Sequence, residues 1–242
     1  MPASETHAEW AKALAETLFA SADSPPRGLT DAQLLTLAWA VKDRAIAAWS
    51  SAPSEVAVAA TLLAQFVADQ PEARTSVTQT ELSAIHCWVS GIADLTRGGM
   101  THALTHLDRA TAQFRTIGQP GHAANAQVPK IMALSVLGRH AEATDCGAAT
   151  FEELLRNGEV LPAAKVSLNL GNLYVRIGSF ADALRQYEKA TTLFETVGDQ
   201  QWSVMSEIGM GDANASLGNF DTALAEYASA KKRAREHALP VL

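Results

Sequence analysis

The chain has 242 residues, of which 48% are hydrophobic and 19% are charged. This composition excludes a broadly disordered chain, because it supplies enough apolar surface to bury a core. The formal net charge of −7 argues against a nucleic-acid-binding protein, because binding phosphates requires a basic face.

The N-terminal sequence MPASETHAEWAKALAETLFA lacks the basic segment and long apolar core of a secretory signal. No run of about 18 apolar residues, the length that spans a membrane, occurs in the chain. We therefore expect a cytoplasmic protein without a membrane partner. The two cysteines, Cys87 and Cys146, form no CxxC motif, and we expect both to pack between helices rather than form a disulfide.

Residues 1–80 are predicted to form N-terminal helices that make a degenerate repeat or a terminal cap. The first helix is expected over Glu5–Ala22. The second is expected from Asp31 to about Trp49, with Thr30 as its N-cap, because a threonine hydroxyl can accept from a free backbone N–H of the first turn.

The third helix is predicted for the sequence EVAVAATLLAQFVADQ, with Ser54 as its N-cap. It is expected to stop before Pro71. The sequence DQPEARTSVTQT then indicates a connection, and the next helix is expected to begin near Thr80.

The rest of the chain repeats with a period of forty residues. A glycine recurs four times at this interval, an alanine follows each glycine by five residues, and a further glycine follows each of the first three by twenty. These positions are Gly98, Gly138, Gly178 and Gly218; Ala103, Ala143, Ala183 and Ala223; and Gly118, Gly158 and Gly198. A fixed period of this length is typical of a repeat array.

Each period predicts two antiparallel helices. The first glycine can adopt the left-handed conformation that ends a helix of roughly 14 residues, and the second closes a helix of roughly 18 residues. The alanine after the turn is small enough for the two helices to approach closely, so we expect Ala183 and Ala223 to be buried. Pro129 lies in or at the start of the first helix of its period, where we expect a kink or a late start.

The sequence NLGNLYVRIGSFADALRQYEKATTLFETVG, Asn169–Gly198, resembles the tetratricopeptide repeat. The residues that carry the resemblance are Leu170, Gly171, Tyr174, Gly178, Phe180, Ala183, Tyr187 and Ala190. The next period matches at Gly211, Gly218, Phe220, Ala223, Tyr227 and Ala230, with Asn214 in place of the first aromatic residue. The family's commonest period is about 34 residues, so this chain is most similar to the longer repeats of arrays in bacterial signalling proteins.

The resemblance implies an all-α fold, a right-handed solenoid of antiparallel helix pairs. Residues 81–242 would then form four repeats. Their expected bounds are about 81–120, 121–160, 161–200 and 201–239.

The resemblance also implies a binding surface, because the first helices of such repeats line a concave groove. Asn172 and Arg176 would project into this groove, Asn169 precedes them on the same helix, and Asp212 is the counterpart of Asn172 one period later. An asparagine both donates and accepts hydrogen bonds, so it can hold the backbone of an extended peptide. The alternative is that Asn169 and Asn172 bond between adjacent repeats.

The matching face of the earlier repeats is apolar. We expect Trp88 and Met132 to contact a partner there, because an exposed apolar patch usually marks an interaction site. The alternative is that the N-terminal helices cover the patch. The full set on this face is Trp88, Ile92 and Leu95, then Val128, Met132 and Ser135.

Other chemistry is weakly supported. His102 and His106 are four residues apart, as zinc ligands on one helix face can be, but no further ligand clearly converges on them. Two combinations supply a thiol and a base, His86 with Cys87 and His140 with Cys146, yet a catalytic cysteine also needs a shaped pocket. No phosphate-binding loop is present. We expect no catalysis, metal or cofactor.

The predicted function is a scaffold that binds a peptide or partner protein in the groove, in a bacterial signalling or regulatory complex. One alternative is the recognition part of a larger effector system, such as the CHAT-type proteases that carry similar arrays. Others are a small-molecule sensor within the superhelix and a self-assembling structural module.

The last predicted helix ends in charged residues. Arg233 replaces Leu193 of the preceding period, which suggests a solvated end where no further repeat follows. Apolar residues nevertheless remain on it and after it, and we expect them to support weak self-association or contact with a partner. They are Leu224, Tyr227, Leu239, Val241 and Leu242. The alternative is that the chain is a fragment whose next repeat was cut away.

Overall fold

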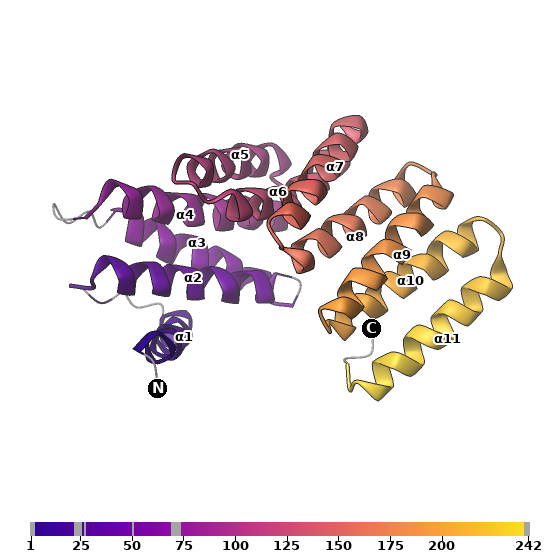
Figure 1. Cartoon of the computed structure of the whole chain (residues 1–242), viewed down its shortest axis with the longest axis horizontal. Helices are drawn as coiled ribbons and strands as arrows, with labels where there is room; N and C mark the ends of the chain where they lie inside the picture. The colour runs from indigo at the N-terminus through magenta and orange to yellow at the C-terminus, as the bar shows by residue number, and fades with distance from the viewer. Residues whose placement is uncertain (1–2, 22–25, 27, 50, 69–73, 240–242) are drawn as a thin grey trace. The chain divides into compact units, whose positions relative to one another are not determined.

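The structure is a computed structural model that describes residues 3–21, 26, 28–49, 51–68 and 74–239. These residues form eleven helices and no strand, so the prediction of an all-α fold is confirmed (Figure 1). The chain divides into two compact units, Met1–Ala126, here called unit 1, and Gln127–Leu242, called unit 2. None of the described helices combines the length and apolar character that crossing a membrane requires.

Unit 1 is built around a central helix, α4. Its helices are α1 (Ala3–Ser21), α2 (Asp31–Ala48), α3 (Pro53–Ala68), α4 (Ser76–Thr96) and α5 (Met100–Thr116), followed by the first part of α6 (Pro120–Val136). Helices α2, α3 and α5 all pack against α4, and twelve of its 21 residues are buried. The N-terminal helices therefore cover the face of α4 on which a partner was expected.

The predicted starts of two N-terminal helices need correction. Thr30 caps α2 as expected, and its hydroxyl and Gln33 form a capping box. Ser54, however, lies inside α3, which begins at Pro53, because the fixed backbone of proline suits the first helical position. Helix α4 begins at Ser76, earlier than the expected Thr80, because Thr75 supplies its cap. The predicted ends at Ala22 and before Pro71 lie outside the described residues.

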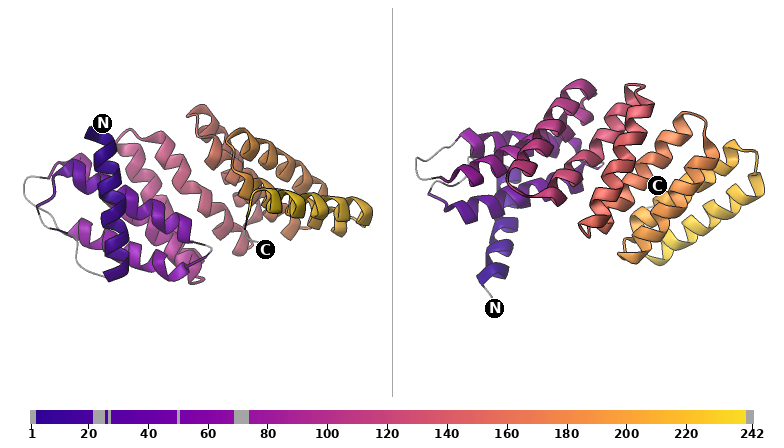
Figure 2. Two further views of the ribbon diagram at one scale, coloured as in Figure 1. Left: turned by 90° about the horizontal axis from the view of Figure 1, so that it is seen from below. Right: turned by 45° about the horizontal axis from the view of Figure 1, so that its top comes forward.

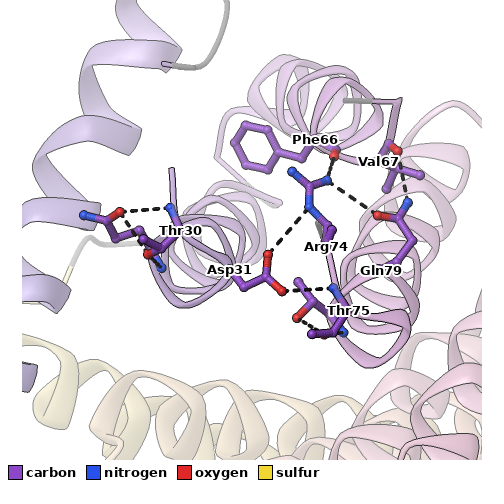
Figure 3. Close-up of polar contacts among 9 residues, drawn as sticks. Thr30, Asp31, Phe66, Val67, Arg74, Thr75 and Gln79 are labelled. Carbon is purple, nitrogen blue, oxygen red and sulfur yellow. Dashed lines mark hydrogen bonds and ion pairs between the residues drawn. The ribbon is translucent and has the colours of Figure 1, made fainter. Parts of the chain in front are cut away.

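A polar cluster joins the ends of α2, α3 and α4 (Figure 3). The Thr75 backbone N–H donates to Asp31 Oδ2 at 3.2 Å, and Arg74 Nε lies 3.9 Å from Asp31 Oδ1. Arg74 Nη1 also donates to the Phe66 carbonyl oxygen at 3.1 Å. Hydrogen bonds from Thr78 and then from Thr75 lower the pKa of Asp31 below its ordinary value of 3.8.

Replacing Asp31 with asparagine is expected to destabilise unit 1 at pH 7 but not in strong acid. Because the pKa of Asp31 is lower in the folded chain, its contribution is present above about pH 4 and is lost as the pH falls through the folded value. Urea unfolding followed by tryptophan fluorescence measures this, since four of the five tryptophans lie in unit 1. Glu16→Gln, an exposed change on α1, is the control. A loss for Asp31→Asn that stayed constant down to pH 2 would contradict this account.

The later helices recur every twenty residues. Helices α5 to α11 each contain 17 residues, so the expectation of a shorter and a longer helix in each pair is wrong. Unit 2 contains the rest of α6, α7 (His140–Arg156), α8 (Val160–Arg176), α9 (Phe180–Thr196), α10 (Gln200–Ser216) and α11 (Phe220–Glu236). Successive helices from α8 to α11 run antiparallel (Figure 2). Pro129 lies inside α6, so the late start considered for this helix is wrong.

The turn at Gly178 shows why the period contains glycine. Its φ of 76° is left-handed, a conformation that other residues adopt only with strain. The Gly178 N–H donates to the Val175 carbonyl at 3.1 Å, and the Ser179 N–H donates to the Tyr174 carbonyl at 2.9 Å. This pair of bonds satisfies the last free carbonyls of α8. The predicted glycine-terminated helices are thereby confirmed.

The predicted close approach of paired helices is also confirmed, because Ala183 is 0% exposed and Ala223 is 2% exposed. Ala183 belongs to a buried cluster that includes Ala164 and Leu168 of α8. Its methyl group thus sits at the contact between α8 and α9.

Replacing Ala183 with leucine is expected to lower the free energy of unfolding by roughly 1–3 kcal/mol, because the added atoms must force α8 and α9 apart. Chemical unfolding followed by circular dichroism measures the loss. Ala181→Leu, an exposed change on the same helix, controls for helix propensity. Equal stability of the two variants would show that the contact between α8 and α9 tolerates a larger side chain.

The predicted solvated end of α11 is wrong for Arg233. Its side chain is only 20% exposed and pairs with Glu207 of α10 and Glu195 of α9. The charge therefore binds inside unit 2 instead of facing water. The prediction that apolar residues stay exposed on this helix holds for Leu224, which is 66% exposed. Val241 and Leu242 lie outside the described residues.

Candidate partner-binding site

Tyr187 of α9 determines the geometry of the candidate site. Its ring is 2% exposed and lies between Gly171 of α8 and Gly209 of α10. A Cβ atom added to Gly171 would lie 2.5 Å from ring atom Cε1, and one added to Gly209 would lie 2.7 Å from it. Only glycine lets the two backbones approach the ring so closely. Three helices therefore meet on one tyrosine.

The hydroxyl of Tyr187 orients the amide of Asn172 on α8. It donates to Asn172 Oδ1 at 2.7 Å, and Asn172 itself is exposed. Because Oδ1 is the accepting end of the amide, Nδ2 keeps both hydrogens for another acceptor. The buried ring thus holds an exposed hydrogen-bond donor in place.

The same arrangement recurs forty residues later. Tyr227 of α11 packs on Gly211 of α10, and its hydroxyl donates to Asp212 Oδ1 at 2.6 Å. Burial, and then the charge of Asp212, raise the pKa of Tyr187 to about 12. The hydrogen bond to Asp212, and then burial, raise the pKa of Tyr227 to about 12. Both tyrosines are therefore protonated donors at neutral pH.

Arg176 and Asn169 have different environments, although they share α8 with Asn172. Arg176 is exposed and forms no ion pair with any described residue. Asn169 is half-buried, and its Nδ2 donates to the Val128 carbonyl of α6 at 3.4 Å. Asn169 therefore makes the bond between successive helix pairs that was the alternative to partner binding. We call Asn172, Arg176 and Asp212 the polar row.

Trp88 does not face a partner, so the prediction for this residue is wrong. It is 2% exposed, and its ring centroid lies 6.5 Å from that of Trp39 and 6.1 Å from that of Phe114, both edge-on. The Nζ atom of Lys42 lies 4.9 Å from the Trp88 centroid. Trp88 is thus a core residue of unit 1. Met132 of α6, the other apolar candidate, is half-buried.

The repeat pattern predicts the two tyrosines as aromatic residues and assigns no role to their hydroxyls. The signal was present, because a tyrosine follows both Asn172 and Asp212 by 15 residues. A phenylalanine would pack equally well there, so the hydroxyl at both positions indicates a hydrogen bond.

The histidines and cysteines considered for metal binding or catalysis make local contacts. His106 Nδ1 lies 2.9 Å from Asp94 Oδ2, and within the described ranges no three His, Cys, Asp or Glu residues form a group that could hold a metal ion. Burial raises the pKa of the Cys87 thiol and lowers the pKa of His86. Cys87 is thus held as a neutral thiol, which is the less nucleophilic form.

Comparisons with protein-family models and with curated proteins find no match. Solved structures match in fold. BtubC from P. vanneervenii is 16% identical, with a TM-score of 0.66 over 98% of this chain and 93% of that one. A Rap protein complexed with Competence and Sporulation Factor is 14% identical, with a TM-score of 0.65 over 86% of this chain.

This chain covers only 56% of the Rap protein's length. A signal transduction ATPase with a tetratricopeptide repeat sensor, from Pyrococcus horikoshii, is also 14% identical. Its TM-score is 0.62, over 84% of this chain and 31% of that one. Identities this low show the fold alone. The chain therefore has the all-α fold of tetratricopeptide-like helix-pair arrays.

Proposed function

We propose that this chain is a scaffold that binds a peptide or partner protein on the polar row of unit 2. The observation that carries the proposal is the repeated tyrosine bond, from Tyr187 to Asn172 and from Tyr227 to Asp212. Each bond holds an exposed polar side chain in one orientation. Binding groups that are ordered in advance lose less conformational entropy when a ligand arrives.

The polar row suggests the chemistry of the partner. Asn172 offers amide hydrogens and Arg176 offers a guanidinium group, so both suit a carbonyl or carboxylate oxygen. Asp212 offers a carboxylate oxygen and suits a basic group or a backbone N–H. The partner segment would thus place an acceptor at α8 and a donor at α10. Asn169 and Met132, both half-buried, would border the site.

The fold supports a binding role. The Rap protein of similar fold is complexed with Competence and Sporulation Factor, and the ATPase of similar fold uses its repeats as a sensor. We place the polar row in the third and fourth repeats, at about residues 161–200 and 201–239. We further propose a bacterial signalling or regulatory complex as the setting, in which the chain recognises the partner for a larger effector, such as a CHAT-type protease.

Replacing Asn172 and Arg176 together with alanine is expected to reduce partner recovery at least tenfold, since lost hydrogen bonds to a charged group cost about 1.5–3 kcal/mol. The measurement is a pull-down from the native host, quantified by mass spectrometry. Arg185→Ala on α9, which also removes one exposed arginine, is the control. Circular dichroism checks that helicity is intact. Equal recovery with wild type and double variant would remove the polar row from the site.

A further inference from the structure

We propose that the outer face of α11 is a second docking surface, which takes an amphipathic helix of a partner protein. The surface consists of residues spaced three or four apart, so that they lie in one stripe along the helix. They are Phe220, Leu224, Tyr227, Lys231 and Arg235. We call this stripe the α11 face. It meets the polar row only at Tyr227, whose hydroxyl bonds to Asp212, and it does not depend on the proposed function.

The first half of the α11 face is apolar and open. Phe220 and Leu224 are each 66% exposed, and no other large hydrophobic residue in the described ranges has so high an exposed fraction. Leu217, at the preceding turn, is 45% exposed. Adjacent exposed residues of this size mark an interaction surface more strongly than scattered ones do.

Helix α9 shows what covers such a face. It carries Phe180, Leu184 and Tyr187 at the positions forty residues before Phe220, Leu224 and Tyr227, and all three are half-buried or buried. Their cover includes α10, which packs along α9 and places Gly209 on the Tyr187 ring.

The occupant of the α11 face follows from this geometry. It is a helix that runs antiparallel to α11, as α10 does to α9. It places a glycine or alanine on the Tyr227 ring, in the way that Gly209 lies on Tyr187, and apolar side chains on Phe220 and Leu224.

The second half of the face, Lys231 and Arg235, is basic and therefore favours an acidic occupant. Helix α9 has Thr191 and Glu195 where α11 has Lys231 and Arg235. Both basic residues are exposed, and neither pairs with an acidic residue in the described part of the chain. An antiparallel helix would lay its N-terminal half beside them. That half should therefore carry aspartate or glutamate.

A second copy of the chain does not supply this helix. The helix with the matching pattern, α10, is packed between α9 and α11 within each copy. A folded copy therefore cannot offer it to a neighbour, and we assign the occupant to a partner protein.

The test uses a peptide derived from the α10 sequence as the probe. Its sequence is that of residues 199–217, DQQWSVMSEIGMGDANASL, with Gln200→Glu and Gln201→Glu to match the basic half of the face. Fluorescence anisotropy of the labelled peptide with the full chain is expected to show saturable binding. Binding should weaken at least about tenfold for the Leu224→Glu protein, and it should also weaken for Lys231→Glu/Arg235→Glu.

Three controls test whether a change in peptide binding comes from the α11 face. Ser229→Glu, an exposed change on the opposite side of α11, should leave binding unchanged. A peptide with Gly209→Leu should bind more weakly although leucine favours the helix, because its side chain would collide with Tyr227. The Asn172→Ala/Arg176→Ala protein should bind the peptide normally, whatever happens at the polar row.

Three results would overturn this proposal. The first is an absence of saturable binding, and the second is equal binding by the wild-type and Leu224→Glu proteins. The third is a wild-type dimer at the assay concentration that Leu224→Glu converts to a monomer in analytical ultracentrifugation, since that would assign the face to a second copy.

Discussion

Replacing Tyr187 with alanine is expected to lower the free energy of unfolding of unit 2 by about 3–5 kcal/mol, the cost of removing a buried aromatic ring. The ring is 2% exposed and separates the backbones of Gly171 and Gly209. Neither glycine has a side chain that could move into the space. The cavity would therefore stay open, at the point where α8, α9 and α10 meet.

Two matched variants test this explanation in urea unfolding followed by circular dichroism. Tyr187→Phe keeps the ring and loses only the bond to Asn172, so it is expected to cost about 1 kcal/mol. Tyr227→Ala removes the equivalent ring of α11, which is half-buried and packs on Gly211, and it should cost clearly less than Tyr187→Ala. Similar losses for the two alanine variants would show that enclosure of the Tyr187 ring is not the cause.

Replacing Arg233 with leucine is expected to cost on the order of 3 kcal/mol, because it leaves a buried carboxylate without its partner. Arg233 Nη1 pairs with Glu207, and Nη2 donates to Gln200 at 2.9 Å and to Ser203 at 3.0 Å. Glu207 is only 7% exposed. Its other oxygen, Oε2, is buried and accepts no hydrogen bond from the described residues.

The preceding period provides the compensating change. The positions of Glu207 and Arg233 are occupied there by Ser167 and Leu193. The double variant Glu207→Ser/Arg233→Leu should therefore recover most of the stability that Arg233→Leu loses, because no buried charge remains. A double-mutant cycle in chemical unfolding measures the coupling. Additive losses would contradict the view that the buried charge causes the destabilisation.

The fold could be predicted because its determinants are local and periodic. A glycine in the left-handed conformation ends a helix whatever surrounds it, and it recurs visibly at Gly178 and Gly218. The small residue that allows close packing recurs with it at Ala183 and Ala223. Such signals need no knowledge of the rest of the chain.

The errors for Trp88 and Arg233 concern contacts between residues far apart in the sequence. Trp88 has the spacing of a groove residue, but its exposure depends on helices α2 and α3, which the period does not include. Arg233 has the composition of a solvated helix end, but its long side chain reaches Glu207 and Glu195. Whether a charged side chain is exposed or buried depends on such partners, and the sequence pattern does not show them.

The candidate site could be predicted only in part. Its exposed residues were expected from the resemblance to the tetratricopeptide repeat, and the structure places Asn172 and Asp212 in equivalent bonds. The orientation of the Asn172 amide depends on a hydroxyl from the next helix, so the direction in which the side chain donates required the structure.

The most direct test of the polar row is an NMR titration of the Asn172 side-chain amide with the partner recovered by pull-down. The signal is assigned by its loss in Asn172→Ala. If the partner binds at the polar row, the Nδ2 hydrogens of Asn172 should shift in proportion to binding, while the side-chain amide of Asn157, at the end of α7, should stay unchanged. A partner that saturates the protein and leaves the Asn172 amide unshifted would contradict the account.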